Sequence, residues 1–436
     1  MANKSLSSQL YEKLVNEEDA RACETIGTEA CKEAPGNFIK MLLSLFLSKL
    51  GDALINPKIT LPWVMQTIGA PAYLLGWLVP IRESGSLLPQ LAIASVIRRM
   101  PVRKWVWVVG SILQAMAVLG IALVAWRLEG SLAGWLVIGL LVIFSLARGL
   151  NSVASKDVLG KTIPKSQRGS LNGWSASGAG LITLAMGAAL ALGLSENSDV
   201  GMYVLGFVGA AILWALAAIV YAGVEEQAGE VDGGRNGLLQ AFKRLSLMQT
   251  DVRFRHFVLT RSLLLCSALS APFIIVMAQQ NIGASIGIMA LFLMASGAAS
   301  LFSGPFWGRF ADTSSRRVMI SSGLMAALVG LLVVACESLA QPWLASLWLL
   351  PGLYFVLSVA HQGVRLGRKT YVVNMAEGNQ RTDYVSISNT IIGVVLLLVG
   401  GVGSLTPIIG LSGVILILSV MGVAGSWMAV RLPEVE

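Results

Sequence analysis

Residues 106–126 read VWVVGSILQAMAVLGIALVAW, a stretch of 21 residues without one charged side chain, and it decides the fold class. A helix needs about 20 apolar residues to cross the hydrocarbon core of a membrane. A second apolar run, GWLVIGLLVIFSLA at 134–147, follows shortly after. Neither run has the two-residue alternation of a membrane β-barrel. The sequence therefore predicts transmembrane helices.

The whole chain has this apolar character. Of its 436 residues, 55% are hydrophobic and 13% are charged, and the mean hydropathy is +0.72. Soluble domains carry about 25% charged residues. We therefore predict an all-α polytopic protein of the lipid bilayer with twelve transmembrane helices in two six-helix bundles. The predicted spans are 40–65, 72–97, 105–126, 132–154, 171–194 and 200–223, then 258–280, 286–308, 318–336, 342–362, 386–405 and 411–430.

The division of the chain follows from these spans. We expect a cytoplasmic tail at 1–37, a first bundle at 38–223, a cytoplasmic linker at 224–257, a second bundle at 258–431 and a tail at 432–436. Residues 1–37 include seven acidic side chains and lack the apolar core of a signal peptide.

Basic residues predict the orientation, because Lys and Arg accumulate in cytoplasmic loops. With a cytoplasmic N-terminus, the inner loops and tails hold 26 of the 32 Lys and Arg residues, and the outer loops hold only Arg127. We expect both termini in the cytoplasm and the protein in the plasma membrane, which is the inner membrane of a bacterium. The net charge of +8 then reflects topology, and we expect no nucleic-acid partner.

Short segments of the first half recur in the second half at a nearly constant offset, which indicates an internal duplication. QTIGA at 66–70 returns as QNIGA at 280–284, an offset of 214. Lys156 and Lys369 are 213 apart, and so are the basic pairs 103–104 and 316–317. Six spans per half would make the halves parallel repeats, related by an axis along the membrane normal.

The segment GRFADTSSRR at 308–317 resembles a loop signature of the major facilitator superfamily, with a glycine, an aspartate four residues later and a basic pair. The resemblance extends from about residue 38 over nearly the whole chain. It implies secondary transport by alternating access and a cytoplasmic gate formed by Gly308, Asp312, Arg316 and Arg317. The equivalent first-half loop, SVIRRMPVRKW at 95–105, lacks both the glycine and the aspartate.

A second segment, LARGLNSVA at 146–154, is similar to a fourth-span motif of proton-coupled exporters in this family. The resemblance implies a role for Arg148 in proton coupling. The proline-containing glycine motif that marks drug antiporters is absent from the fifth span, GWSASGAGLITLAMG at 173–187. Import and export therefore both stay open.

Charged side chains inside spans are costly and usually face a cavity or a partner. In the first span, Lys49, Asp52 and Asn56 share one helix face, and Pro57 interrupts the backbone ladder after them. In the second span, Arg82 and Glu83 fall at a similar depth. They and the first-span charges either form static ion pairs (Lys49–Asp52 with Arg82–Glu83, or Asp52–Arg82) or line a cavity that binds a solute or a proton.

His361 is the one histidine of the predicted spans, and it either titrates near neutral pH or packs as a hydrogen-bonded core residue. We expect proton coupling through Asp52, Glu83 and Arg148. The predicted substrate-binding residues are Lys49, Asp52, Asn56, Arg82, Glu83, Arg148 and His361. We predict no catalytic residue, no metal and no cofactor.

Together these features predict a monomeric secondary active transporter of a small anionic or zwitterionic solute, coupled to protons. The main alternative is a proton-driven efflux antiporter for drugs or metabolites. More distant alternatives are a sensor built on a transport fold and a membrane enzyme, but the two histidines offer no convincing catalytic pair.

Overall fold

The computed structural model describes residues 28–97, 99–164, 167–192, 200–229, 231, 247–311, 313–375 and 378–435. All the elements in these ranges are helices. The first half contains α3 (Thr28–Leu54), α4 (Thr60–Thr67), η2 (Ala72–Leu74), α5 (Leu75–Leu87), α6 (Gln90–Ile97), α7 (Lys104–Arg127), α8 (Gly130–Thr162), α9 (Arg168–Leu192) and α10 (Val200–Ala222).

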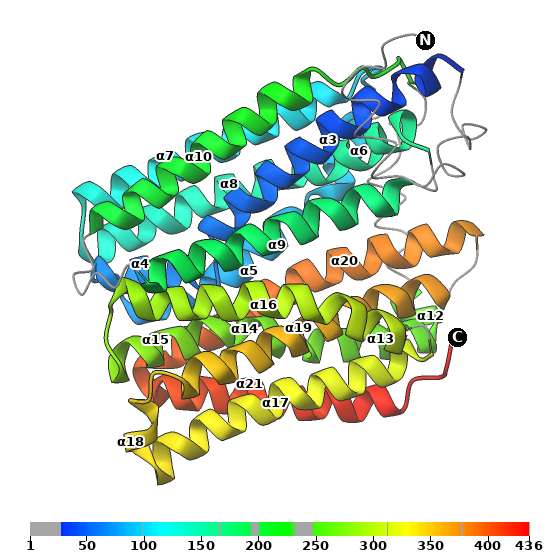
Figure 1. The fold of residues 1–436 in the computed structure, drawn as a ribbon. Coiled ribbons are helices and arrows are strands. Elements are labelled where there is room, and N and C mark those ends of the chain that lie inside the picture. Colours follow the sequence, from blue (N-terminus) through cyan, green and yellow to red (C-terminus); the bar gives the residue numbers. More distant parts are fainter. Residues whose placement is uncertain are drawn as a thin grey trace.

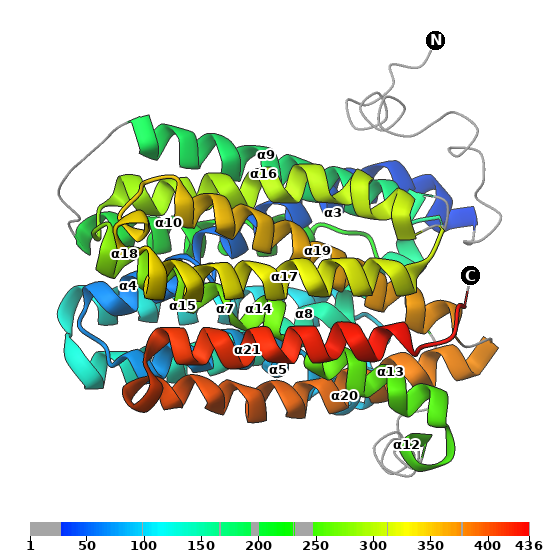
Figure 2. The same cartoon turned by 90° about the horizontal axis from the view of Figure 1, so that it is seen from below.

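The second half contains α12 (Leu247–Thr250), α13 (Val252–Leu263), α14 (Cys266–Leu269), α15 (Ala271–Asn281), α16 (Ile286–Ala311), α17 (Ser315–Leu339), α18 (Gln341–Leu344), α19 (Leu349–Asn374), α20 (Gly378–Gly400), η4 (Gly401–Leu405) and α21 (Thr406–Val430). The long helices lie side by side in one bundle (Figures 1 and 2). We call the end where α3 begins and α21 ends the proximal end, and the opposite end the distal end.

Eight stretches of the described chain are long and apolar enough to cross a membrane, and one of them, 387–430, contains both α20 and α21. Three further expected crossings are too short or too polar to meet this criterion of length and hydropathy. The chain breaks between α3 and α4 and between α5 and α6, while α19 carries several charged side chains. This arrangement is consistent with the twelve expected crossings.

Proline accounts for two of these breaks, because it has no N–H to donate and its ring displaces the preceding turn. Pro57 lies in the turn between α3 and α4, and Pro89 lies between α5 and α6. Broken helices of this kind form binding sites in many transporters.

The two halves repeat one packing pattern. In the first half, α7 packs against α8 and α10. In the second half, the equivalent helix α17 packs against α19 and α21. The most extensive contacts between the halves are those of two helix pairs, α9 with α16 and α5 with α20. These pairs are the fifth with the eighth crossing and the second with the eleventh, so they also follow the repeat.

The tenth crossing corrects the sequence prediction. We expected a span at 342–362, but α19 begins at Leu349 and continues to Asn374. The charged stretch after His361 therefore belongs to the helix and not to a loop. The first crossing also differs, because α3 begins at Thr28 and ends at Leu54. Charged residues mislead a hydropathy window where a helix lines a polar interior.

Candidate functional site

The first part of the site lies where α3 ends. Asp52 occupies its last turn, and the chain then turns through 55–59 before α4 begins. The Asn56 side-chain Oδ1 accepts a hydrogen bond of 2.9 Å from the Lys58 backbone N–H. The Asn56 carbonyl also accepts one of 3.0 Å from Leu61 N–H. Asn56, predicted to bind substrate, thus stabilises the turn that follows Asp52.

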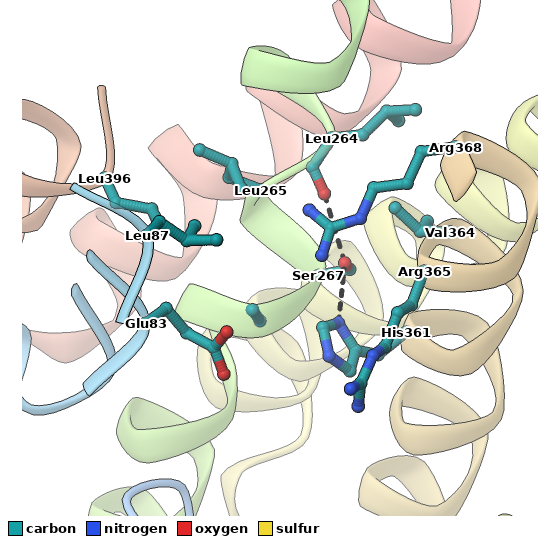
Figure 3. A pocket seen from close by; sticks show the side chains of 11 residues that line it. Glu83, Leu87, Leu264, Leu265, Ser267, His361, Val364, Arg365, Arg368 and Leu396 are labelled. Atoms are coloured by element: carbon teal, nitrogen blue, oxygen red, sulfur yellow. Dashed lines mark hydrogen bonds between the residues drawn. The ribbon is translucent and has the colours of Figure 1, made fainter. Parts of the chain in front are cut away.

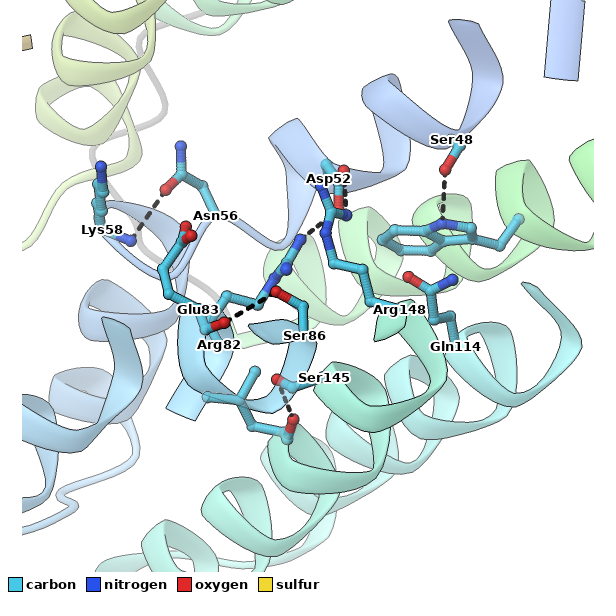
Figure 4. A network of polar contacts seen from close by, with 12 residues as sticks. Ser48, Asp52, Asn56, Lys58, Arg82, Glu83, Ser86, Gln114, Ser145 and Arg148 are labelled. Atoms are coloured by element: carbon cyan, nitrogen blue, oxygen red, sulfur yellow. Dashed lines mark hydrogen bonds and ion pairs between the residues drawn. The ribbon is translucent and has the colours of Figure 1, made fainter. Parts of the chain in front are cut away.

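Asp52 forms ion pairs with two arginines from neighbouring helices (Figure 4). Arg82 of α5 donates from Nη2 to Asp52 Oδ1 at 2.7 Å. Arg148 of α8 donates from Nη1 to both carboxylate oxygens. The Arg82 guanidinium also lies 4.9 Å from the centre of the Phe144 ring. The carboxylate of Asp52, with 19% of its side chain exposed, therefore joins three helices, α3, α5 and α8.

Glu83, although adjacent to Arg82, points away from this cluster. It lines a pocket between the two halves, together with α13–α14, α19 and α20 (Figure 3). The charges that act on its carboxylate are those of Arg365, Arg82, Lys58 and Arg368. In the described part of the chain Glu83 nevertheless makes no ion pair. The pocket therefore holds an ionisable group without a fixed partner.

The second half contributes one face of α19. His361, Arg365 and Arg368 follow one another at spacings of four and three residues, so they share a face, and all three line the pocket. Ser267 Oγ donates to Leu264 O at 3.1 Å and lies 3.2 Å from His361 Nδ1. The break between α13 and α14 thus orients the histidine ring.

Cations of the two halves also interact outside the lining of the pocket. The charge of Arg365 acts on Lys49 of the first half, and the charge of Lys156 in the first half acts on Lys369. Beside them, Arg261 is 6% exposed and donates to Ser388 Oγ and Asn389 Oδ1, at 2.7 and 2.8 Å. The second half of the site is therefore strongly positive.

The predicted residues fall into three groups. Asp52, Arg82 and Arg148 meet in one cluster, and Glu83 and His361 line the pocket. Lys49 does neither, because its Nζ binds Ser175 Oγ at 2.7 Å and Asn172 O at 3.1 Å on α9. Of the ion pairs considered from sequence, Asp52–Arg82 is present.

Sequence reasoning missed Arg365, Arg368 and Ser267. The two arginines were assigned to a loop, because the predicted span ended at 362. The three-and-four spacing from His361 was a usable signal, since it is the period of a helix face. Ser267 had no comparable signal, because only the break between α13 and α14 brings its hydroxyl beside His361.

The predicted gate residues lie at the proximal end. Arg316 pairs with Glu434 at 2.8 Å and donates to Leu432 O at 2.9 Å. Ser314 Oγ accepts from Arg317 N–H at 3.1 Å and caps α17. Gly308 has open space beside its Cα, and Asp312 lies outside the described residues. The basic pair is thus attached to the C-terminal stretch.

At the distal end the two halves are in close contact. A Cβ atom on Gly76 of α5 would lie 2.6 Å from Gly403 Cα, and one on Gly400 would lie 2.6 Å from Pro80 Cγ. Trp77 Nε1 donates across the same contact to Ser404 Oγ at 3.1 Å. Glycine is required here because no side chain fits between the backbones.

The model of the Major Facilitator Superfamily matches residues 41–278, which is more than half of the 436-residue chain. The chain belongs to the major facilitator superfamily. The match covers the first bundle and the break at α13–α14, and therefore most of the pocket. No curated protein matches this superfamily member.

Solved structures of other superfamily members share its fold over the whole chain. A D-xylose-proton symporter superposes with a TM-score of 0.70 at 16% identity, covering 92% of this chain and 98% of its own. A POT family transporter in complex with 5-aminolevulinic acid gives 0.72 at 11% identity, covering 94% and 99%. A variant of the nucleoside transporter NupG gives 0.65 at 13%, covering 91% and 99%. Likeness at these identities establishes the fold alone.

Proposed function

We propose that this chain is a secondary active transporter that moves a small anionic or zwitterionic solute by alternating access, with protons as the coupling ion. The observation that carries the proposal is the position of Glu83. Its carboxylate comes from the first half, and it faces Arg365 and Arg368 of the second half across the pocket. A solute bound there would contact both halves and would respond to their relative motion.

Alternating access is supported by how the halves touch. Two helix pairs, α5–α20 and α9–α16, connect them, and close glycine contacts hold the distal end together. Near the proximal end, Lys156 and Lys369 oppose each other with like charge. Rocking about the two helix pairs would open one end as the other closes.

Proton coupling is assigned to Glu83 in preference to Asp52. Asp52 is held by two arginines, so protonating it would leave the buried charge of Arg82 and the partly exposed charge of Arg148 without compensation. Glu83 has no fixed partner, and its protonation would change the charge of the pocket itself. Arg148 then acts indirectly by holding Asp52. One solved structure with this fold is described as a proton symporter, which agrees with such coupling.

The remaining expectations belong to the same proposal. We place the protein in the bacterial inner membrane as a monomer, with both termini and the linker at 224–257 in the cytoplasm. The proximal end is then the cytoplasmic end. The division into bundles at 38–223 and 258–431 also stays part of the proposal, as does the efflux antiporter as the alternative mode.

The experiment is transport into liposomes that contain a trapped pH-sensitive dye. The purified protein would receive organic anions, amino acids, sugars and cationic drugs in turn. We expect a pH change with an anionic or zwitterionic solute, and its loss in Glu83→Gln. Glu129→Gln is the matched control, because Glu129 is exposed in the distal loop after α7. An unchanged proton signal in Glu83→Gln would refute the coupling role.

A further inference from the structure

The pocket between the halves has two chemically different walls. One wall is cationic and consists of Arg365 and Arg368 on α19, with Glu83 of the first half facing them. The other wall is aliphatic and combines side chains from α5, the α13–α14 break, α19 and α20 (Figure 3). Its members are Leu87, Leu264, Leu265, Val364 and Leu396.

The charges of the pocket do not balance. Among the residues that line the pocket, Arg365 and Arg368 carry two positive charges and Glu83 carries one negative charge, which leaves one positive charge. Charges without partners become costly when a site closes and excludes water. A ligand that brings negative charge therefore favours closure, whereas a cation or a neutral sugar does not.

The two arginines have free donors. Arg365 lines the pocket and is exposed, and it has no hydrogen-bond or ion-pair partner in the described chain. The Nε of Arg368 is buried without a hydrogen-bond partner. Both project from one face of α19, three residues apart. Planar guanidinium groups bind a carboxylate through two parallel hydrogen bonds, which gives such a pair a preference for an acid head group.

The aliphatic wall makes a small inorganic anion a poor fit. The five side chains of this wall carry no polar group, and they adjoin the arginines. A small anion would leave this apolar surface in contact with water, so the free energy that comes from burying the surface would not be gained. Ligand pockets usually combine an apolar lining with a few polar groups that fix the orientation of the bound molecule.

We propose that this pocket takes an amphiphilic organic anion, with its carboxylate on Arg365 and Arg368 and its apolar body against Leu264, Leu265 and Leu396. The inference rests on the proposed transport function, because it names the substrate class of that site. The inference also predicts an order of affinities, because an acid with a larger apolar body binds more tightly than a short acid of the same charge.

The test is ligand-dependent thermal unfolding of the full-length protein in detergent, without any gradient. The probes are 3-phenylpropionate, acetate, 3-phenylpropan-1-ol and 2-phenylethylammonium. We expect 3-phenylpropionate to bind at least about tenfold more tightly than acetate, because it buries several more carbon atoms. The alcohol and the cation should bind more weakly than the aromatic acid.

Variants separate binding from folding. Arg365→Gln and Arg368→Gln should abolish the preference for 3-phenylpropionate over the alcohol, and Arg365→Lys should retain part of it. Arg127→Gln is the control, because Arg127 is in the distal turn over the Trp126 ring and far from the pocket. If Arg365→Gln does not fold, the milder Arg365→Lys and the probe series on the wild type still test the inference.

Three results would overturn the inference. They are equal affinities for acetate and 3-phenylpropionate, tightest binding of 2-phenylethylammonium, or an unfolding temperature that no probe changes. The result is also distinct from the fate of the transport proposal. Selective binding of the aromatic acid without any flux in liposomes would leave the pocket assignment intact and refute transport. Flux of a sugar or a cation, without binding of any acid, would leave transport intact and refute the pocket assignment.

Discussion

Arg82 and Glu83 are neighbours in sequence, yet their side chains act in different halves of the site. Arg82 turns into its own bundle and binds Asp52 at 2.7 Å, whereas Glu83 faces Arg365 and Arg368 of the second bundle. Successive residues on a helix point about 100° apart, because 3.6 residues make one turn. One turn of α5 thus supplies both a fixed ion pair and a carboxylate without a partner.

Replacing Asp52 by Asn should destabilise the fold. The substitution leaves Arg82, with 7% of its side chain exposed, and Arg148 without their shared carboxylate. Removing one partner of a fully buried ion pair costs about 3–5 kcal/mol, and the cost here is smaller because 33% of the Arg148 side chain is exposed. We expect a clear fall in the unfolding temperature in detergent, and a smaller fall for Asp52→Glu. An unchanged unfolding temperature for Asp52→Asn would show that water already compensates these arginines.

Replacing Gly76 by Ala should open the distal end. The new Cβ would lie 2.6 Å from Gly403 Cα, and backbone atoms have little room to yield. Overpacking costs about 1–3 kcal/mol, enough to change a two-state population about tenfold. Spin labels at Arg127 and Ser338 would report a longer distance between the halves. Gly139→Ala is the control, since nothing lies within 4 Å of that position. Equal distances in both variants would contradict the prediction.

Reversing one charge at the proximal end should close it. Lys156 and Lys369 belong to different halves and repel each other. Lys156→Glu replaces this repulsion by attraction, so we expect the proximal ends to approach without any solute. Spin labels at Met100 and Asn374 would measure a shorter distance. The double variant Lys156→Glu and Lys369→Glu restores like charges and should return the wild-type distance; a distance that stays short would contradict the repulsion.

Asp251 and Tyr384 should make stability depend on pH at both extremes. Burial acts to raise the pKa of Asp251, but hydrogen bonds from Tyr384 and the Phe254 N–H outweigh it, and the pKa lies below its ordinary value. Burial and the Asp251 carboxylate raise the pKa of Tyr384 to about 12. Both groups precede the apolar stretches that begin at Val252 and Ile387.

The signs follow from linkage. The Asp251 contribution is present above its unfolded pKa of about 3.9 and is lost as the pH falls through the lower folded value. The Tyr384 contribution is present below about pH 10 and is lost as the pH rises towards 12. Unfolding temperatures across pH should therefore decline at both ends. Tyr384→Phe should remove the alkaline decline, and a decline that persists would assign it to other groups.

The sequence determined the membrane class, the superfamily and much of the first cluster. Apolar runs such as 106–126 predict crossings because hydrocarbon accepts few other segments. The charges at Asp52, Arg82, Glu83 and Arg148 stand out because each is costly inside a span. His361 stands out for the same reason, and it does line the pocket. These inferences depend on local composition, which a sequence displays directly.

The tertiary structure alone decided which charges meet. Asp52, Arg82 and Arg148 come together because α3, α5 and α8 converge, and Lys49 turns aside to Ser175 on α9. Arg365 and Arg368 enter the site because α19 continues through its charged turns along the pocket, where polar groups on the facing half replace lipid. The free energy of a charge in a span depends on its neighbours in space, and those neighbours come from the packing of distant helices.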